Sequence, residues 1–329
     1  MNVPTVTHNG LSFINVNKPN EEQIKFLNKN FGFSMLNLED YLYKTQIPKI
    51  EVDEDYSLVV MDVPYIQQAA RSKASSNILS NRVPFPALPK SAKRKRINIG
   101  EVDFFIGKDY LVVLHDDRTP QIDEIFEMCK ITSKHREDLM GKGGAYLFYK
   151  IADILIDSSF GYVEDITSTI DYIDRQLEEK SGAALIEDIS ITRRNIVVFE
   201  TMIKPLLPIF ADLEKGRYHK LNGEMVDYWS NLLDHLQKIW ERLEDNKELI
   251  AGIASSNESI LSNRSNELVK FLTVITSISF PFVIVNNLYS MNVQGLPFSQ
   301  QPWIVPALFF VIFAGGVGIV SYFKYRDWL

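Results

Sequence analysis

The feature that most constrains this chain is a long uncharged stretch near its C-terminal end. Charged residues are dense up to Lys270, and then Phe271 to Phe323 carries no Asp, Glu, Lys or Arg. A bilayer core about 30 Å thick requires roughly 20 helical residues at 1.5 Å each. Two segments meet this requirement, residues 271–289 and residues 303–323. The sequence therefore predicts two transmembrane helices, joined by a loop over residues 290–302.

The two predicted spans differ in polarity. The second contains small residues that let another helix approach closely: Ala314, Gly315, Gly316 and Gly318. The first is unusually polar and contains Thr273, Thr276, Ser277, Ser279, Asn286 and Asn287. Polar groups at membrane depth either face other helices or water, or bond back to carbonyl groups of their own helix. The first alternative predicts a channel-lining helix, and the second predicts an ordinary packed helix.

Basic residues on the flanks set the expected orientation. Arg264 and Lys270 precede the first span, Lys324 and Arg326 follow the second, and the loop between the spans has no basic residue. The positive-inside rule then places both termini in the cytosol and the loop outside the cell membrane. The N-terminal residues resemble no signal peptide. A single cysteine, Cys129, fits a reducing cytosol.

The first part of the chain, residues 1–143, has the pattern of a mixed α/β domain. Residues 21–30 have the pattern of a short helix, and residues 56–61 are rich in strand-forming side chains. Two further apolar runs, residues 103–106 and 110–114, are separated by Gly107-Lys108-Asp109, which predicts a β-hairpin.

A basic loop is expected inside this domain, over residues 67–96. It holds eight Lys and Arg residues, no acidic residue and three prolines. Lys93-Arg94-Lys95-Arg96 superficially resembles a nucleic-acid patch. The net charge of −7 argues against a nucleic-acid partner. We interpret the stretch as a solvated loop that touches anionic membrane lipid.

From residue 144 onward the chain is predicted to be helical. Apolar residues at three- and four-residue spacing indicate a pair of helices with acidic outer faces over residues 144–219, the second from about Leu185 to Glu214. The acidic faces are interpreted as solvated, with attraction of cations as the alternative. Next comes a stalk, residues 220–270. Between Glu224 and Leu288 the first proline is Pro281, which predicts one helix of about 65 residues and roughly 95 Å. One chain cannot shield such a helix, so we expect an oligomer.

Motifs in the last third of the chain resemble the CorA family of magnesium transporters. They stand in the order and spacing of that family: Ser262-Asn263-Arg264-Ser265-Asn266-Glu267, Phe280-Pro281, Tyr289-Ser290-Met291-Asn292, Leu296-Pro297, and the closing run Tyr322-Phe323-Lys324-Tyr325-Arg326-Asp327-Trp328-Leu329. The resemblance extends over nearly the whole chain and is strongest from Glu258 to the end.

The resemblance implies a fold and an assembly. It implies an α+β cytosolic domain, a long stalk helix and two transmembrane helices, assembled as a funnel-shaped homopentamer whose first spans line one pore. The family's Gly-Met-Asn motif corresponds to Ser290, Met291 and Asn292 at the outer mouth. There the oxygen of Asn292 would hold a divalent cation through its water shell, which suits Mg²⁺ because Mg²⁺ dehydrates reluctantly.

A stripe along the first span supports such a pore. Its members step by three or four residues and therefore share one helix face: Val269, Leu272, Thr276, Phe280, Val283 and Asn287. In a symmetric bundle each would form a ring, and the apolar rings would make a constriction that gates by dewetting. The alternative is a plain seam between helices.

Several positions depart from the family pattern. Ser290 replaces a glycine, Val283 stands where many relatives have threonine, and Asn287 stands where they have a small residue. The external loop has no acidic residue. The family's cytosolic regulatory site uses carboxylates between protomers, and its stalk acid falls on Asn231 here. These departures leave open which ion is carried and whether cytosolic Mg²⁺ gates the protein.

The leading hypothesis is a homopentameric channel for divalent cations that moves Mg²⁺, with Co²⁺ and Ni²⁺ as further candidate ions. One alternative is a transporter of zinc or another transition metal on the same scaffold. Another is a membrane-anchored regulatory pentamer that does not conduct. An enzyme is not expected, because the sequence has no Gly-rich phosphate loop. It also shows no metal-ligand cluster among its histidines: His8, His115, His135, His219 and His235.

Overall fold

The computed structural model describes residues 3–43, 46–66, 96–179, 183–291, 301 and 303–326. The chain divides into two compact units, an N-terminal unit over Met1–Ala254 and a C-terminal unit over Ser255–Leu329. Most of the predicted basic loop, residues 67–95, lies outside the described residues, as do Asn292 and most of the predicted external loop.

The N-terminal unit is built on a six-stranded mixed sheet with strand order β1-β2-β6-β5-β4-β3. Only β2 and β6 run parallel among these neighbours. The hairpin expected from two apolar runs is confirmed, since residues 103–106 of β5 pair with residues 111–114 of β6. The strands are β1 (Thr5–His8), β2 (Leu11–Asn17), β3 (Lys49–Val52), β4 (Tyr56–Ile66), β5 (Ile97–Gly107) and β6 (Tyr110–His115).

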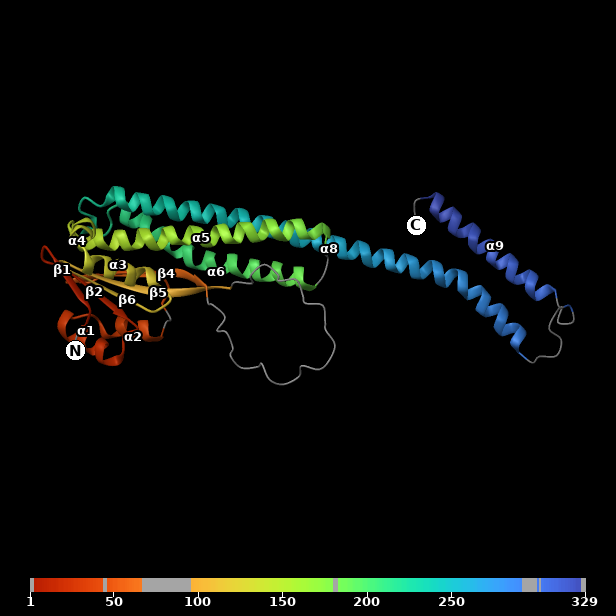
Figure 1. Cartoon of the computed structure of the whole chain (residues 1–329), viewed down its shortest axis with the longest axis horizontal. Helices are drawn as coiled ribbons and strands as arrows, with labels where there is room; N and C mark the ends of the chain where they lie inside the picture. Colours follow the sequence, from red (N-terminus) through yellow and green to blue (C-terminus); the bar gives the residue numbers. More distant parts are fainter. Residues whose placement is uncertain are drawn as a thin grey trace. The chain divides into compact units, whose positions relative to one another are not determined.

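Helices cover both faces of the sheet (Figure 1). One face packs on α1 (Glu21–Phe31) and α2 (Met35–Tyr43), where Phe33 stacks on Phe105 at 4.3 Å between ring centroids. The other face packs on α3 (Pro120–Ile131), α5 (Gly144–Glu179) and α6 (Ala183–Glu214), while α4 (Ser133–Met140) joins α3 to α5. Because both faces are buried, the central strands are near-continuous apolar runs.

Local sequence explains where the first helix begins. Asn20 and Gln23 form a capping box, in which each side chain accepts a hydrogen bond from the backbone of the other. Gly32 ends the helix with a positive φ of 70°, a conformation that suits glycine. The helix predicted over residues 21–30 is therefore confirmed.

Three long helices extend from the sheet. The predicted pair is confirmed as α5 and α6, and the long helix is confirmed as α8 (Val226–Ser290), which follows the short α7 (His219–Asn222). The first part of α8 packs on α5 through Trp229, which is fully buried and lies 5.7 Å from Phe148 between ring centroids. Further along the same seam, Asn246 donates to Thr167.

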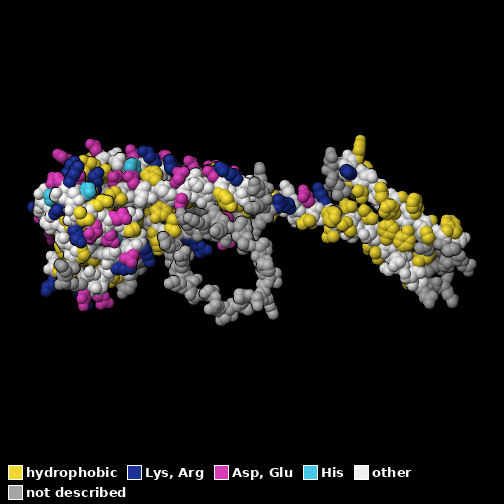
Figure 2. Space-filling view, in the orientation of Figure 1, with side chains coloured by type: hydrophobic (Ala, Val, Ile, Leu, Met, Phe, Trp, Pro, Cys, Tyr) yellow, Lys and Arg dark blue, Asp and Glu magenta, His cyan; other side chains and the backbone are white. Residues whose placement is uncertain are grey.

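The C-terminal unit holds the remainder of α8 and α9 (Ile304–Tyr325). Both helices are long and apolar enough to cross a membrane, and their apolar stretches are almost unburied within the chain. Figure 2 shows apolar side chains gathered over this unit, whereas charged and apolar side chains are mixed over the N-terminal unit. The boundaries 271–289 and 303–323 fall inside α8 and α9 apart from Trp303, which directly precedes α9.

Candidate functional site

The two apolar helices touch each other along one face of α8. Phe282 stacks on Phe309 of α9 with 5.5 Å between ring centroids. A Cβ added to Gly316 would lie 3.3 Å from a side-chain carbon of Ile278. The absence of a side chain at Gly316 therefore brings α9 close to α8, as expected from the small residues of the second span.

The covered face of α8 is a regular stripe. Between residues 271 and 290, six residues of α8 are partly covered and the others are exposed. The six recur at one-, three- and four-residue steps, as one helix face requires. They are Val274, Ile278, Pro281, Phe282, Val285 and Tyr289.

The predicted pore stripe lies on the opposite face. Its six members are all exposed in the single chain: Val269, Leu272, Thr276, Phe280, Val283 and Asn287. At 3.6 residues per turn, the centre of this stripe is roughly 170° around the helix from the centre of the covered stripe. The six residues thus share the side of α8 opposite α9, and the other residues of α8 between 271 and 290 outside the covered stripe are exposed as well.

Hydroxyl groups on α8 bond back to its own backbone. Thr273 donates to the carbonyl of Val269 and Thr276 donates to that of Leu272, at 2.7 and 2.8 Å. These are the bonds of the alternative in which the polar side chains are satisfied within their helix. Since each hydroxyl oxygen keeps lone pairs, the exposed Thr276 still presents an acceptor on the open face.

The expected outer mouth is described only in part. Ser290 is the last residue of α8, and its hydroxyl donates to the carbonyl of Asn286 at 2.6 Å. The helix therefore continues through the position where the family pattern has glycine. Met291 follows and is 56% exposed. Asn292 lies outside the described residues.

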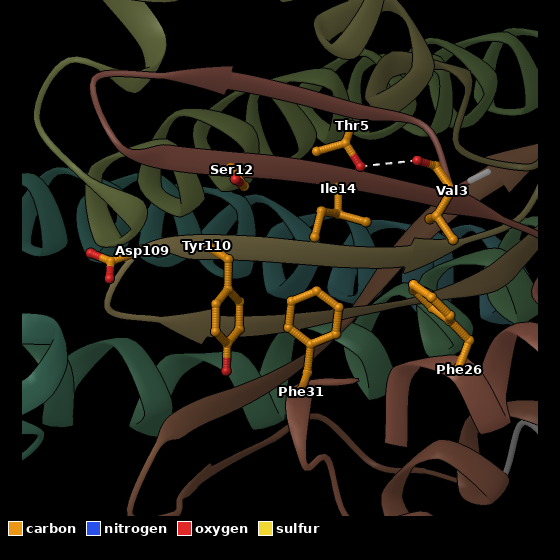
Figure 3. A pocket seen from close by; sticks show the side chains of 8 residues that line it. All are labelled: Val3, Thr5, Ser12, Ile14, Phe26, Phe31, Asp109 and Tyr110. Carbon is orange, nitrogen blue, oxygen red and sulfur yellow. Dashed lines mark hydrogen bonds between the residues drawn. The ribbon is translucent and has the colours of Figure 1, made fainter. Parts of the chain in front are cut away.

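A hollow in the N-terminal unit contains no predicted site residue. Figure 3 shows three aromatic rings along its lower side, with Asp109 at one end and Thr5 and Ser12 above. It lies between α1 and strands β1, β2 and β6. Its lining is mostly apolar and consists of Val3, Thr5, Ser12, Ile14, Phe26, Phe31, Asp109 and Tyr110.

The first part of α8 faces acidic residues of α5. Asn231, the position of the stalk acid, donates to Asp153 at 3.4 Å. His235 lies beside carboxylates of α5, and its Nδ1 is 2.9 Å from Asp157 Oδ1. Sequence inspection missed this cluster because α5 and α8 are distant in the chain. The one local signal was the one-turn spacing of Asp153 and Asp157.

Comparison with known proteins covers both units. The family described as "CorA-like Mg2+ transporter protein" matches residues 8–326. The cobalt/magnesium transport protein CorA of Thermotoga maritima is 24% identical over 300 residues, which cover 91% of this chain and 78% of that protein. The protein of the same name from Methanocaldococcus jannaschii is 20% identical over 305 residues, covering 92% and 87%.

Solved structures show the same fold along the whole chain. The complete structure of the CorA magnesium transporter from Methanocaldococcus jannaschii matches with a TM-score of 0.73 at 20% identity, covering 97% of this chain and 92% of that one. The full-length CmaX protein matches with a TM-score of 0.66 at 17% identity, covering 97% and 88%. With a family match over residues 8–326 and two apolar C-terminal helices, the chain belongs to the CorA-like Mg²⁺ transporter family: it is a membrane protein that transports divalent cations, and it is not an enzyme.

Proposed function

We propose that five copies of this chain assemble around one pore, and that the pore conducts Mg²⁺ across the cell membrane. The observation that carries the proposal is the exposed stripe on α8, opposite the face that α9 covers. With α9 on one side, the other side of α8 is left for neighbouring copies and for the ion path. Each stripe residue would then occur five times, as a ring.

The rings differ in chemistry along the proposed pore. Leu272, Phe280 and Val283 present apolar surfaces, which hold water poorly and make a barrier to ions when the pore is narrow. Thr276 and Asn287 present oxygen atoms between and beyond these rings. This alternation fits a gate made of apolar rings, with polar positions where a hydrated ion can pause.

The proposed mouth is formed by Ser290, Met291 and Asn292, on the outer side of the membrane. Both termini would face the cytosol, so the large N-terminal unit would lie there as well.

The membrane potential would drive the transport. An inside-negative potential lowers the free energy of a divalent ion that enters the cytosol by about 4.6 kcal/mol per 100 mV, twice the value for one charge. No other energy source is required. The outward face of α9, with exposed Phe310, Phe313 and Val317, would contact lipid.

The test is ion flux into liposomes that contain the purified protein. We expect Mg²⁺ uptake driven by an inside-negative potential, and its loss in Asn292→Ala. Asn292→Gln keeps the amide and serves as the matched control for the chemistry of the ring. Absence of flux with Mg²⁺, Co²⁺, Ni²⁺ and Zn²⁺ alike would contradict conduction and favour the regulatory pentamer.

The identity of the ion is decided in the same assay. Unlabelled Co²⁺, Ni²⁺ and Zn²⁺ compete with Mg²⁺ at equal concentration. We expect Mg²⁺ to be carried and Zn²⁺ to compete weakly, because amide and hydroxyl oxygens are hard ligands. Preferential Zn²⁺ uptake would instead assign the chain to the transition-metal alternative.

A further inference from the structure

The hollow in the N-terminal unit combines aromatic walls with one carboxylate. In Figure 3 the rings of Tyr110, Phe31 and Phe26 stand side by side, and Asp109 lies at the end next to Tyr110. Sites for small molecules measure roughly 300 to 1,000 Å³, and this hollow has a volume of about 410 Å³. It therefore has room for a ligand of small-molecule size.

Neighbouring residues hold two of these rings in fixed positions. Phe31 stacks on the fully buried Phe33 at 5.4 Å between ring centroids and meets Tyr110 at 5.0 Å, with an angle of 67° between the last two ring planes. Tyr110 in turn lies across Gly107, where a Cβ would come within 2.3 Å of its ring. Two rings at a steep angle form a corner that exists before a ligand arrives, which lowers the entropic cost of binding.

The rings retain accessible surface for a ligand. Phe26, Phe31 and Tyr110 pack against the apolar core of the domain but are only partly buried. The face of an aromatic ring carries partial negative charge and attracts a cation within about 6 Å of the ring centroid. Such rings suit a methylated ammonium group, because its methyl groups are apolar, whereas Mg²⁺ dehydrates reluctantly.

Charge at the hollow also favours a cation. Asp109 is exposed at one end, and no Lys, Arg or His is among the lining residues in the part of the chain that the structure describes. Burial, and then the negative charge of Asp55, raise the pKa of the Tyr110 hydroxyl, so a second carboxylate acts on the same side of the hollow. These groups attract a cation and repel an anion.

The lining disfavours other classes of ligand. A metal ion would find the carboxylate of Asp109 as its only charged ligand among the lining residues, and an anionic ligand would face that carboxylate without a basic partner. We propose that the hollow binds a small, soluble organic cation with a methylated ammonium group, which packs against Phe31 and Tyr110 with Asp109 beside its charge. The site shares no residue with the proposed pore, and it stands whether or not the protein conducts.

The experiment is a calorimetric titration of the full-length protein, in a detergent that has no choline headgroup. Choline is the probe, and the comparison is the uncharged alcohol in which carbon replaces the ammonium nitrogen. We expect one choline per chain and at least tenfold weaker binding of the alcohol, because only choline carries a positive charge. Phosphocholine carries the phosphate of a lipid headgroup and should also bind at least tenfold more weakly, because Asp109 repels it. Equal or tighter binding of either compound would overturn the proposal.

Two substitutions and a matched control locate the site. Phe31→Leu removes a ring but keeps an apolar side chain, and it should weaken choline binding at least fivefold. Asp109→Asn should weaken it at least threefold, a smaller effect because Asp109 is exposed to solvent, and for the same reason this change is not expected to prevent folding. Asp138→Asn removes an exposed carboxylate on α4, outside the hollow, and should leave the choline affinity unchanged. Unchanged affinity in both Phe31→Leu and Asp109→Asn, or no choline binding at millimolar concentrations, would overturn the proposal.

Discussion

The two units of this protein bury their apolar side chains in different ways. The N-terminal unit encloses its core between two helical layers and a sheet, with Phe104, Val113 and Trp229 fully buried. The C-terminal unit leaves large apolar side chains exposed on both helices, including Leu272, Phe280 and Phe310. A water-soluble protein rarely exposes so large an apolar surface.

This difference shows what each unit requires. The N-terminal unit buries its apolar side chains within one chain, and this burial stabilises its fold. The apolar side chains of the C-terminal unit are covered instead by lipid and, in the proposed assembly, by other copies of α8. Changes in the first should therefore affect the folding of one chain, and changes in the second should affect assembly and conduction.

The largest effect is expected for Val283→Asp, on the exposed stripe of α8. In the proposed pentamer this change places five carboxylates in one narrow ring. A charged residue at membrane depth costs about 2.5 to 3.5 kcal/mol per chain on insertion scales, and like charges add repulsion. We expect loss of the pentamer or of all flux, measured by light scattering and by liposome uptake. Val283→Thr is the matched control and should retain both; normal flux in Val283→Asp would remove this face from the pore.

The next largest effect is expected when Trp229 is replaced, with Trp303 as the comparison. Trp229 is fully buried and donates to the Leu221 carbonyl at 3.2 Å, so Trp229→Ala should lower the free energy of unfolding of the N-terminal unit by about 3 to 5 kcal/mol. Trp303 is 65% exposed beside α9, and Trp303→Ala should leave that unit unchanged. Thermal denaturation followed by near-ultraviolet circular dichroism measures both. Equal losses would contradict the independence of the two units.

The sequence predicted the elements that depend on local patterns. Apolar residues at helical spacing predicted α5 and α6, and the uncharged stretch predicted the two spans. The hairpin of β5 and β6 followed from Gly107-Lys108-Asp109 between apolar runs. Each of these signals lies within a few turns of the chain or within one hairpin.

Features that depend on distant contacts could not be predicted. The parallel pairing of β2 with β6 joins residues about one hundred positions apart, and no local pattern specifies it. The cluster around His235 likewise requires that α5 and α8 pack in one register. For the candidate pore, the sequence predicted the stripe, but the contacts of α9 with Phe282 and Ile278 are what show which face of α8 is covered.

A smaller effect concerns one partly buried carboxylate in the N-terminal unit, that of Asp62. Burial raises the pKa of Asp62 from 3.8 to about 7. The folded state therefore binds a proton more tightly than the unfolded state, and stability falls as pH rises from about 4 to about 7. Asp62→Asn should remove this loss and raise stability by up to about 4 kcal/mol at pH 8, with little gain at pH 4, because one pKa unit corresponds to about 1.4 kcal/mol. Melting temperatures at both pH values measure it; a gain that does not depend on pH would contradict the assignment.

The smallest effect tests how closely α9 packs on α8. Even a Cβ at Gly316 would approach Ile278 to 3.3 Å, so Gly316→Leu should push the helices apart and cost about 1 to 3 kcal/mol. A Cβ at the neighbouring Gly315 meets no atom within 4 Å, among the residues that the structure describes, which makes Gly315→Leu the matched control. Because the contact lies within the C-terminal unit, unfolding of the N-terminal unit should be the same in both variants. Thermal stability of the assembled protein in detergent measures the difference, and equal stability of the two variants would show that α9 does not rest on this face of α8.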